Sequence, residues 1–158
     1  MAITSAICNS FKVEILQGGH NFNDASGAPT GNAFKLALFT DSATLSKSTT
    51  QYTAPTDASA DPTNTKEVSS TSTGYTTGGN ALTSTTPVLS GDTACCKFAD
   101  TSFTSASFTA RGCLIYNSTN SNKAVCAINF GANKTVTSGT FTIQFPAQTA
   151  GNAIIQIA

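Results

Sequence analysis

ARGCLIYNSTNSNKAVCAINF, residues 110–130, is the stretch that most clearly indicates the fold. Two runs of β-branched, aromatic and other apolar residues, at 113–116 and 124–128, flank a connector made only of Asn, Ser, Thr and one Lys. This pattern is typical of a β-hairpin. Because side chains alternate across a strand, both faces of this hairpin would be apolar. We therefore expect it in the middle of a layered β structure, covered on both sides.

The register of this hairpin depends on how its connector folds. A symmetric connector places Leu114 opposite Val125 and Cys113 opposite Cys126. One face would then hold Cys113, Ile115, Cys126, Ile128 and Phe130, and the other Leu114, Tyr116, Val125 and Ala127. Two cysteines that face each other could form a cross-strand disulfide, although directly opposed Cβ atoms lie slightly farther apart than a disulfide prefers. The alternative is a pair of buried free thiols.

The composition is that of one uncharged domain spanning residues 1–158. The chain has a mass of 16.1 kDa, with 39% hydrophobic and only 10% charged residues. Eight basic residues balance eight acidic ones, so no excess charge is available to attract nucleic acid or an anionic membrane. A neutral surface rich in hydroxyl groups is better suited to self-association or to docking on a larger assembly.

The cysteines and the chain start exclude several classes of protein. Five cysteines without a CxxC spacing argue against both a disulfide framework and a structural zinc site. Cys95 and Cys96 are adjacent and would point to opposite faces of a strand, which makes a shared metal unfavourable. The first twelve residues lack the features of a signal peptide, and no apolar run approaches the ~18 residues of a membrane span.

Elements outside the central hairpin follow from periodicity. Apolar residues recur every three to four positions over 5–17, which predicts a helix capped by Thr4 or Ser5 and ended by Gly18-Gly19; a strand over 11–15 is the competing interpretation. Strands are predicted at 33–40, 80–85, 94–99, 102–109, 139–145 and 152–158, with a lightly buried or edge-like pattern at 102–109 and a turn of the chain at 131–133. The predicted fold is mainly β: an antiparallel β-sandwich, jelly-roll-like, with one N-terminal helix.

Two segments look unlike regular elements. Residues 41–66 are rich in Ser, Thr, Ala and Asp and contain Pro55 and Pro62, which predicts a long surface loop or arm. This arm is either a projection that contacts a neighbour or a tolerated insertion. Residues 67–82 carry three glycines around Tyr75, a cluster that usually bends the backbone or brings it close to another group.

No residue pattern indicates catalysis, a cofactor or a metal, so the sequence predicts a protein that is not an enzyme. The single histidine, His20, lies near Asp24, but without a nearby nucleophile a local hydrogen bond explains it better than catalysis. Arg111 is the only arginine. It is expected to pair with a carboxylate such as Asp100 inside the fold, or else to bind across an interface.

A series of motifs resembles a widespread family of small virion proteins of tailed bacteriophages. In order they are FKVEILQGGHNF (11–22), NAFKLALFTDSATL (32–45), EVSS (67–70), GYTTGGNALT (74–83), CKFADTSF (96–103), FTARGCLIYNST (108–119), INFG (128–131) and GTFTIQF (139–145), followed by the Ile-rich end. The likeness covers nearly the whole chain apart from residues 41–65. It implies a capsid-associated cement or decoration protein, or another virion component without catalytic residues.

The expected function is therefore to bind and stabilise the major capsid lattice, on the exterior of a phage particle assembled in the host cytoplasm. The expected partners are the major capsid protein and further copies of this chain, for example in a trimer. The N-terminal segment and the 41–66 arm are the candidate contact regions. A tail or fibre component that contacts the host receptor is the alternative, and a hydrolase of cell-wall glycans is a third hypothesis, for which paired acidic residues are missing.

Overall fold

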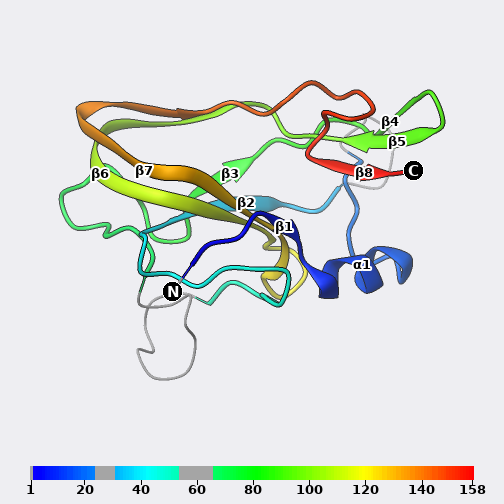
Figure 1. Ribbon diagram of the computed structural model, residues 1–158, viewed down its shortest axis with the longest axis horizontal. Coiled ribbons are helices and arrows are strands. Elements are labelled where there is room, and N and C mark those ends of the chain that lie inside the picture. Colours follow the sequence, from blue (N-terminus) through cyan, green and yellow to red (C-terminus); the bar gives the residue numbers. More distant parts are fainter. Residues whose placement is uncertain (1, 24–30, 54–65) are drawn as a thin grey trace.

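The computed structural model describes residues 2–23, 31–53 and 66–158, which form a mainly β structure with two antiparallel sheets and one short helix (Figure 1). In chain order the elements are β1 (Ala6–Ile7), α1 (Asn9–Leu16), β2 (Phe34–Phe39), β3 (Asn80–Leu82), β4 (Val88–Ser90), β5 (Thr93–Cys96), β6 (Thr101–Asn117), β7 (Lys123–Ile143) and β8 (Ile155–Ile157). The larger sheet has the order β1-β7-β6-β2-β3 and the smaller one β4-β5-β8. The predicted sandwich-like, mainly β fold with one helix near the N-terminus is confirmed.

Strands β6 and β7 form one long hairpin that folds back over itself (Figure 1). The ribbon curves at the left of the view, so that its turn half and its outer half lie in two layers. Phe130 and Phe141, eleven positions apart on β7, meet across these layers with ring centroids 6.2 Å apart. Because of this bend, the turn half and the outer half of the hairpin face each other and pack together as two sides of one core.

Bulges produce the bend. The β6–β7 pairing shifts register at four places, including the steps from Phe103 to Ala106 and from Ala110 to Gly112. Ser105 and Gly131, beside two of these steps, have positive φ angles of 51° and 79°. An extra residue on one strand of a pair increases twist and turns the strand. The turn expected at 131–133 is thus present as a bend at Gly131, but it does not separate two strands, because β7 continues through it.

Because of these bulges, the alternation of side chains predicted at 102–109 is wrong. Simple alternation separates Phe103 from Ala106 and Phe108, but the extra residue at Ser105 brings all three to the buried face, with exposed fractions of 3%, 0% and 7%. This segment is the outer half of β6 rather than a lightly buried strand of its own. Likewise, 139–143 belongs to β7, which ends at Ile143.

Around the turn, the predicted burial is confirmed and the predicted register is wrong. Residues 113–116 and 124–127 are all at most 3% exposed, so both faces are covered. Leu114 pairs with Ala127, and Cys113 pairs with Ile128 instead of Cys126. A five-residue turn between Asn117 and Lys123, followed by a bulge between Ile115 and Tyr116, moves the pairing by two residues.

The N-terminal helix is shorter than predicted. It begins at Asn9 and is capped by Cys8 without a side-chain hydrogen bond, not by Thr4 or Ser5. The preceding residues are extended because Ala6 and Ile7 pair with β7. The predicted end is confirmed: Gly18 follows the helix with a φ of +73°. The competing strand over 11–15 is excluded.

The described part of the predicted arm lies against the body of the protein. Leu45 forms a parallel bridge with Ile3, and Gln51 bridges to Lys123. Ala43, Leu45 and Tyr52 are buried. Pro55 and Pro62 lie outside the described residues. The two candidate contact regions, the N-terminus and residues 41–53, are therefore neighbours on one side of the fold.

The remaining predicted strands are present with other bounds. The prediction at 33–40 corresponds to β2, whereas those at 80–85, 94–99 and 152–158 correspond to the shorter β3, β5 and β8. The structure also contains β4, which was not predicted. Among the described residues, α1 is the one helix, and it is not long and apolar enough to cross a membrane.

Gly79 is required by a close backbone contact. It has a φ of +72°, and a Cβ added there would lie 1.7 Å from the carbonyl oxygen of Leu36 on β2. Gly18 has nearly the same φ, but a Cβ there would meet nothing within 4 Å. We expect Gly18→Ala to cost about 1–2 kcal/mol, for backbone conformation alone. Gly79→Ala should cost clearly more, because β2 must also move.

Urea denaturation of both variants measures this difference in the free energy of unfolding. Equal destabilisation by the two substitutions would show that the Gly79–Leu36 contact is not as close as described.

Candidate functional site

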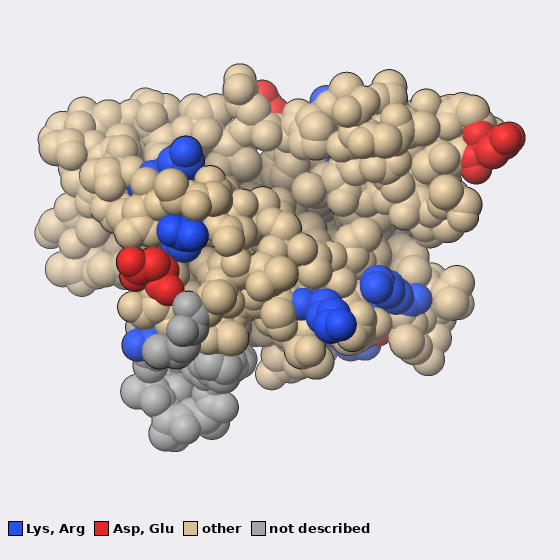
Figure 2. All heavy atoms as spheres, viewed as in Figure 1, with Lys and Arg blue, Asp and Glu red and all other residues tan. Residues whose placement is uncertain are grey.

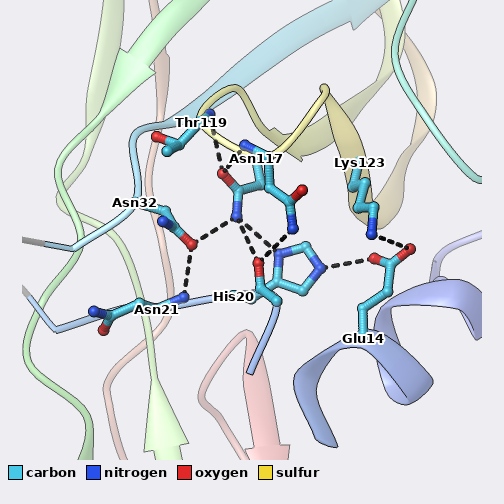
Figure 3. Close-up of polar contacts among 9 residues, drawn as sticks. Glu14, His20, Asn21, Asn32, Asn117, Thr119 and Lys123 are labelled. Carbon is cyan, nitrogen blue, oxygen red and sulfur yellow. Dashed lines mark hydrogen bonds and ion pairs between the residues drawn. The ribbon is translucent and has the colours of Figure 1, made fainter. Parts of the chain in front are cut away.

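The single histidine belongs to a buried polar network that joins the helix to the central hairpin (Figure 3). His20 Nε2 lies 2.8 Å from Glu14 Oε2 on α1, and His20 Nδ1 lies 3.0 Å from Asn117 Nδ2 at the end of β6. Lys123, at the start of β7, lies 3.6 Å from the other Glu14 oxygen. His20 is 6% exposed and Asn117 is fully buried.

Asn117 determines which ring nitrogen of His20 carries the proton. Its Oδ1 accepts the backbone N–H groups of Thr119 and Asn120, each at 3.1 Å. Its Nδ2 therefore faces His20 and also donates to Asn32 Oδ1 at 2.9 Å. His20 Nδ1 must accept, so Nε2–H donates to Glu14. Both ring nitrogens are engaged within the fold.

This arrangement supports the structural interpretation of His20. The ring packs on Phe11 with centroids 4.7 Å apart, and no nitrogen is directed to solvent. A general base needs a free nitrogen within reach of its substrate. The predicted local hydrogen bonding of His20 is confirmed, and Asp24 lies outside the described residues.

Asn117→Ala tests the importance of this network. It leaves His20 Nδ1 and two turn N–H groups without their partner, and buried polar groups without partners cost about 1–3 kcal/mol. We expect a loss of about 3 kcal/mol in the free energy of unfolding. Asn152→Ala is the control, because Asn152 is exposed and its side chain donates to Thr149 Oγ1 at the surface.

Chemical denaturation measures both variants. A loss below about 0.5 kcal/mol for Asn117→Ala, the range of ordinary surface substitutions, would contradict the proposed role.

The glycine-rich stretch around Tyr75 forms a second network, centred on Glu67. Glu67 Oε1 accepts from Tyr75 Oη at 2.5 Å and from the Gly78 backbone N–H at 2.7 Å, and Oε2 accepts from Tyr52 Oη at 2.9 Å. Tyr116 donates to the Gly78 carbonyl at 2.8 Å and stacks on Tyr52 with centroids 4.4 Å apart. The three tyrosines of the chain thus hold this loop against the sheet.

These tyrosines resist ionisation. Burial, followed by the negative charge of Glu67, raises the pKa of Tyr52, Tyr75 and Tyr116 far above the ordinary value of 10.0. Because the pKa of these tyrosines is higher in the folded than in the unfolded state, their contribution to the free energy of unfolding is fully present below the unfolded-state pKa of ~10. It falls as the pH rises above that value.

We therefore expect the free energy of unfolding to fall above about pH 10, with tyrosinate appearing only as the protein unfolds. Ultraviolet absorbance of tyrosinate and circular dichroism, recorded in one alkaline titration, should change together. Tyrosinate formation near pH 10 in a protein with unchanged circular dichroism would contradict the network.

Arg111 does not form the expected internal pair with Asp100. Its Nε donates to Asn129 Oδ1 at 3.3 Å, whereas Asp100 Oδ1 accepts the Phe145 backbone N–H at 2.9 Å. The hydrogen bond from Asn133 is the main factor that lowers the pKa of Asp41, with a smaller contribution from the charge of Arg111. The bulge between Ala110 and Gly112 redirects this part of the hairpin, and a sequence pattern does not reveal it.

All five cysteines are buried free thiols. Burial raises the pKa of Cys8 to about 11 and that of Cys96 to about 12, and it raises the pKa of Cys113 and Cys126 as well. A thiol is reactive as its thiolate, so these four side chains are poorly suited to nucleophilic chemistry at neutral pH. Cys113 and Cys126 share a face, as predicted, but each lies opposite an isoleucine.

An apolar groove opens between the two layers of the folded hairpin. Its volume is about 630 Å³, and its lining includes Ile128, Phe130, Phe141, Ile143 and Ile154. Lys134 is the single charged residue among the lining residues. Figure 2 shows a hollow between the upper and lower layers, on a face with few charged side chains. This lining can bind apolar groups and offers no acid–base pair.

Sequence reasoning missed the residues that organise both networks. Glu67 and Asn117 are single polar residues beside a glycine cluster and at a strand end, positions where polar side chains are common. Their importance depends on partners distant in sequence. Within the ranges described, no group of three or more His, Cys, Asp or Glu side chains is placed to hold a metal ion.

No protein-family model, no curated protein and no solved structure matches this chain.

Proposed function

We propose that this protein is a structural component of a bacteriophage virion that binds the major capsid lattice as a cement or decoration protein. The observation that carries the proposal is the contrast between its polar and apolar groups. His20, Glu14 and Glu67 are engaged in hydrogen bonds within the fold, while an apolar groove with one charged lining residue remains accessible. This combination favours binding of protein surfaces over catalysis.

The resemblance to small virion proteins of tailed phages supplies the identity of the partner. A cement protein bridges several lattice subunits, and binding is then strengthened by multivalency rather than by one tight contact. A near-neutral surface suits such a role, because little charge has to be desolvated on docking. The N-terminal segment and residues 41–53 are adjacent and form the proposed lattice-contacting side.

The test uses phage particles made with and without the gene for this protein. Protein analysis and cryo-electron microscopy of complete particles should find it on the outside of the head, and particles lacking it should release DNA at a lower temperature. Purified protein added back should restore the wild-type release temperature. Thr44→Arg, at an exposed position beside buried Leu45, should weaken add-back, whereas Thr104→Arg, at an exposed position on β6 that does not line the groove, should not.

Absence of the protein from purified particles would overturn the virion proposal. A tail or fibre component that contacts the host receptor is the second candidate, favoured by the exposed threonines and serine of the outer half of β7, at Thr135, Thr137, Ser138, Thr140 and Thr142. Hydroxyl groups in such a row can bind polar receptor groups. Density on the tail instead of the head would select this alternative.

A further inference from the structure

The outer part of β7 and the strand β4 are among the sheet edges that lack a neighbouring strand within the described ranges. β7 pairs with β1 only at Cys126 and Ala127, so from Phe130 to Ile143 no described strand pairs with its side opposite β6. β4 is the outermost strand of the smaller sheet and pairs with β5 alone. Unpaired edges present backbone N–H and C=O groups that can pair with another chain.

The β4–β5 hairpin carries apolar side chains in solvent. Leu89 is 73% exposed and Val88 is 45% exposed, and both lie on β4. The turn to β5 contains exposed Gly91 and Asp92. This hairpin lies at one end of the molecule, where Figure 2 shows acidic atoms and Figure 1 shows a projecting loop. It offers an unpaired edge, two apolar side chains and a negative charge.

The groove beside β7 offers the complementary features. It adjoins a smaller hollow of about 300 Å³ beside β1, because Ile128 and Ile154 line both. Its apolar residues include partly exposed Phe130, Phe141 and Ile143, and its one charged lining residue is the cation Lys134. The unpaired edge of β7 runs along the same groove.

We propose that the β4–β5 hairpin of one molecule docks in the β7 groove of a second copy of the same chain. β4 adds to the free edge of β7, Leu89 enters the apolar groove, and Asp92 pairs with Lys134; Val88, on the opposite face of β4, stays outside the groove. Opposite charges and two unpaired edges on separate parts of one molecule specify the second copy as the occupant.

The contact joins different surfaces of the two copies, so it is heterologous. Contacts of this kind close into rings when the rotation allows and otherwise extend into chains. β4 spans three residues, about 10 Å, so it needs only a short unpaired part of the β7 edge. This self-association is independent of the virion role and exists in solution without a capsid.

Sedimentation velocity of the purified chain over a wide concentration range tests the proposal. The wild type should show reversible association, and Leu89→Lys should weaken it at least ~10-fold, since an apolar anchor becomes a charge. Leu16→Lys is the matched control: Leu16 on α1 is 87% exposed and lies outside both surfaces. It should associate as the wild type does. Circular dichroism and thermal unfolding verify that each variant is folded.

A charge exchange tests the pairing itself. Asp92→Lys and Lys134→Asp should each weaken association, and the double variant should restore it, because the two charges then attract again. A wild type that stays monomeric at every concentration would overturn the proposal. So would association unaffected by Leu89→Lys, weakened equally by Leu16→Lys, or not restored in the double variant.

Discussion

The pairing of β6 with β7 is the constraint on which the rest of the structure depends. These two strands run for 17 and 21 residues, and bulges fold their ribbon so that its outer half covers its turn half. A flat hairpin of this length would expose one apolar face to water. By bending, it buries Phe103, Ala106 and Phe108, and the smaller elements then add to its edges and ends.

The same bend creates the accessible surface. Where the ribbon changes layer, β7 leaves β1 and runs without a second neighbour among the described strands, and the space between its two halves is the apolar groove. The polar networks lie elsewhere, between the helix and the turn and under the glycine-rich loop. The structural polar groups and the accessible apolar groove are thus separated, and the proposed function rests on this separation.

The sequence predicted features that depend on local pattern. The central hairpin, its burial on both faces, strand 33–40 and the end of the helix at Gly18 follow from apolar periodicity and turn residues. It did not predict features that depend on one inserted residue: the bulge at Ser105, the continuation of β7 through the bend at Gly131 and the register of Cys113. Period-two alternation cannot reveal a bulge, because an extra residue reverses every later side chain. Partners distant in the chain, such as Asn117 with His20, could not be predicted from local pattern either.

Hydrogen exchange of backbone amides tests the central role of the folded hairpin most directly. Amides at 113–116 and 124–127 should exchange only through global unfolding and be the slowest in the protein. Amides on the unpaired side of β7 between 130 and 143 should exchange much faster than those directed to β6. Slowest exchange in the β4-β5-β8 sheet, or uniform protection along β7, would contradict the account.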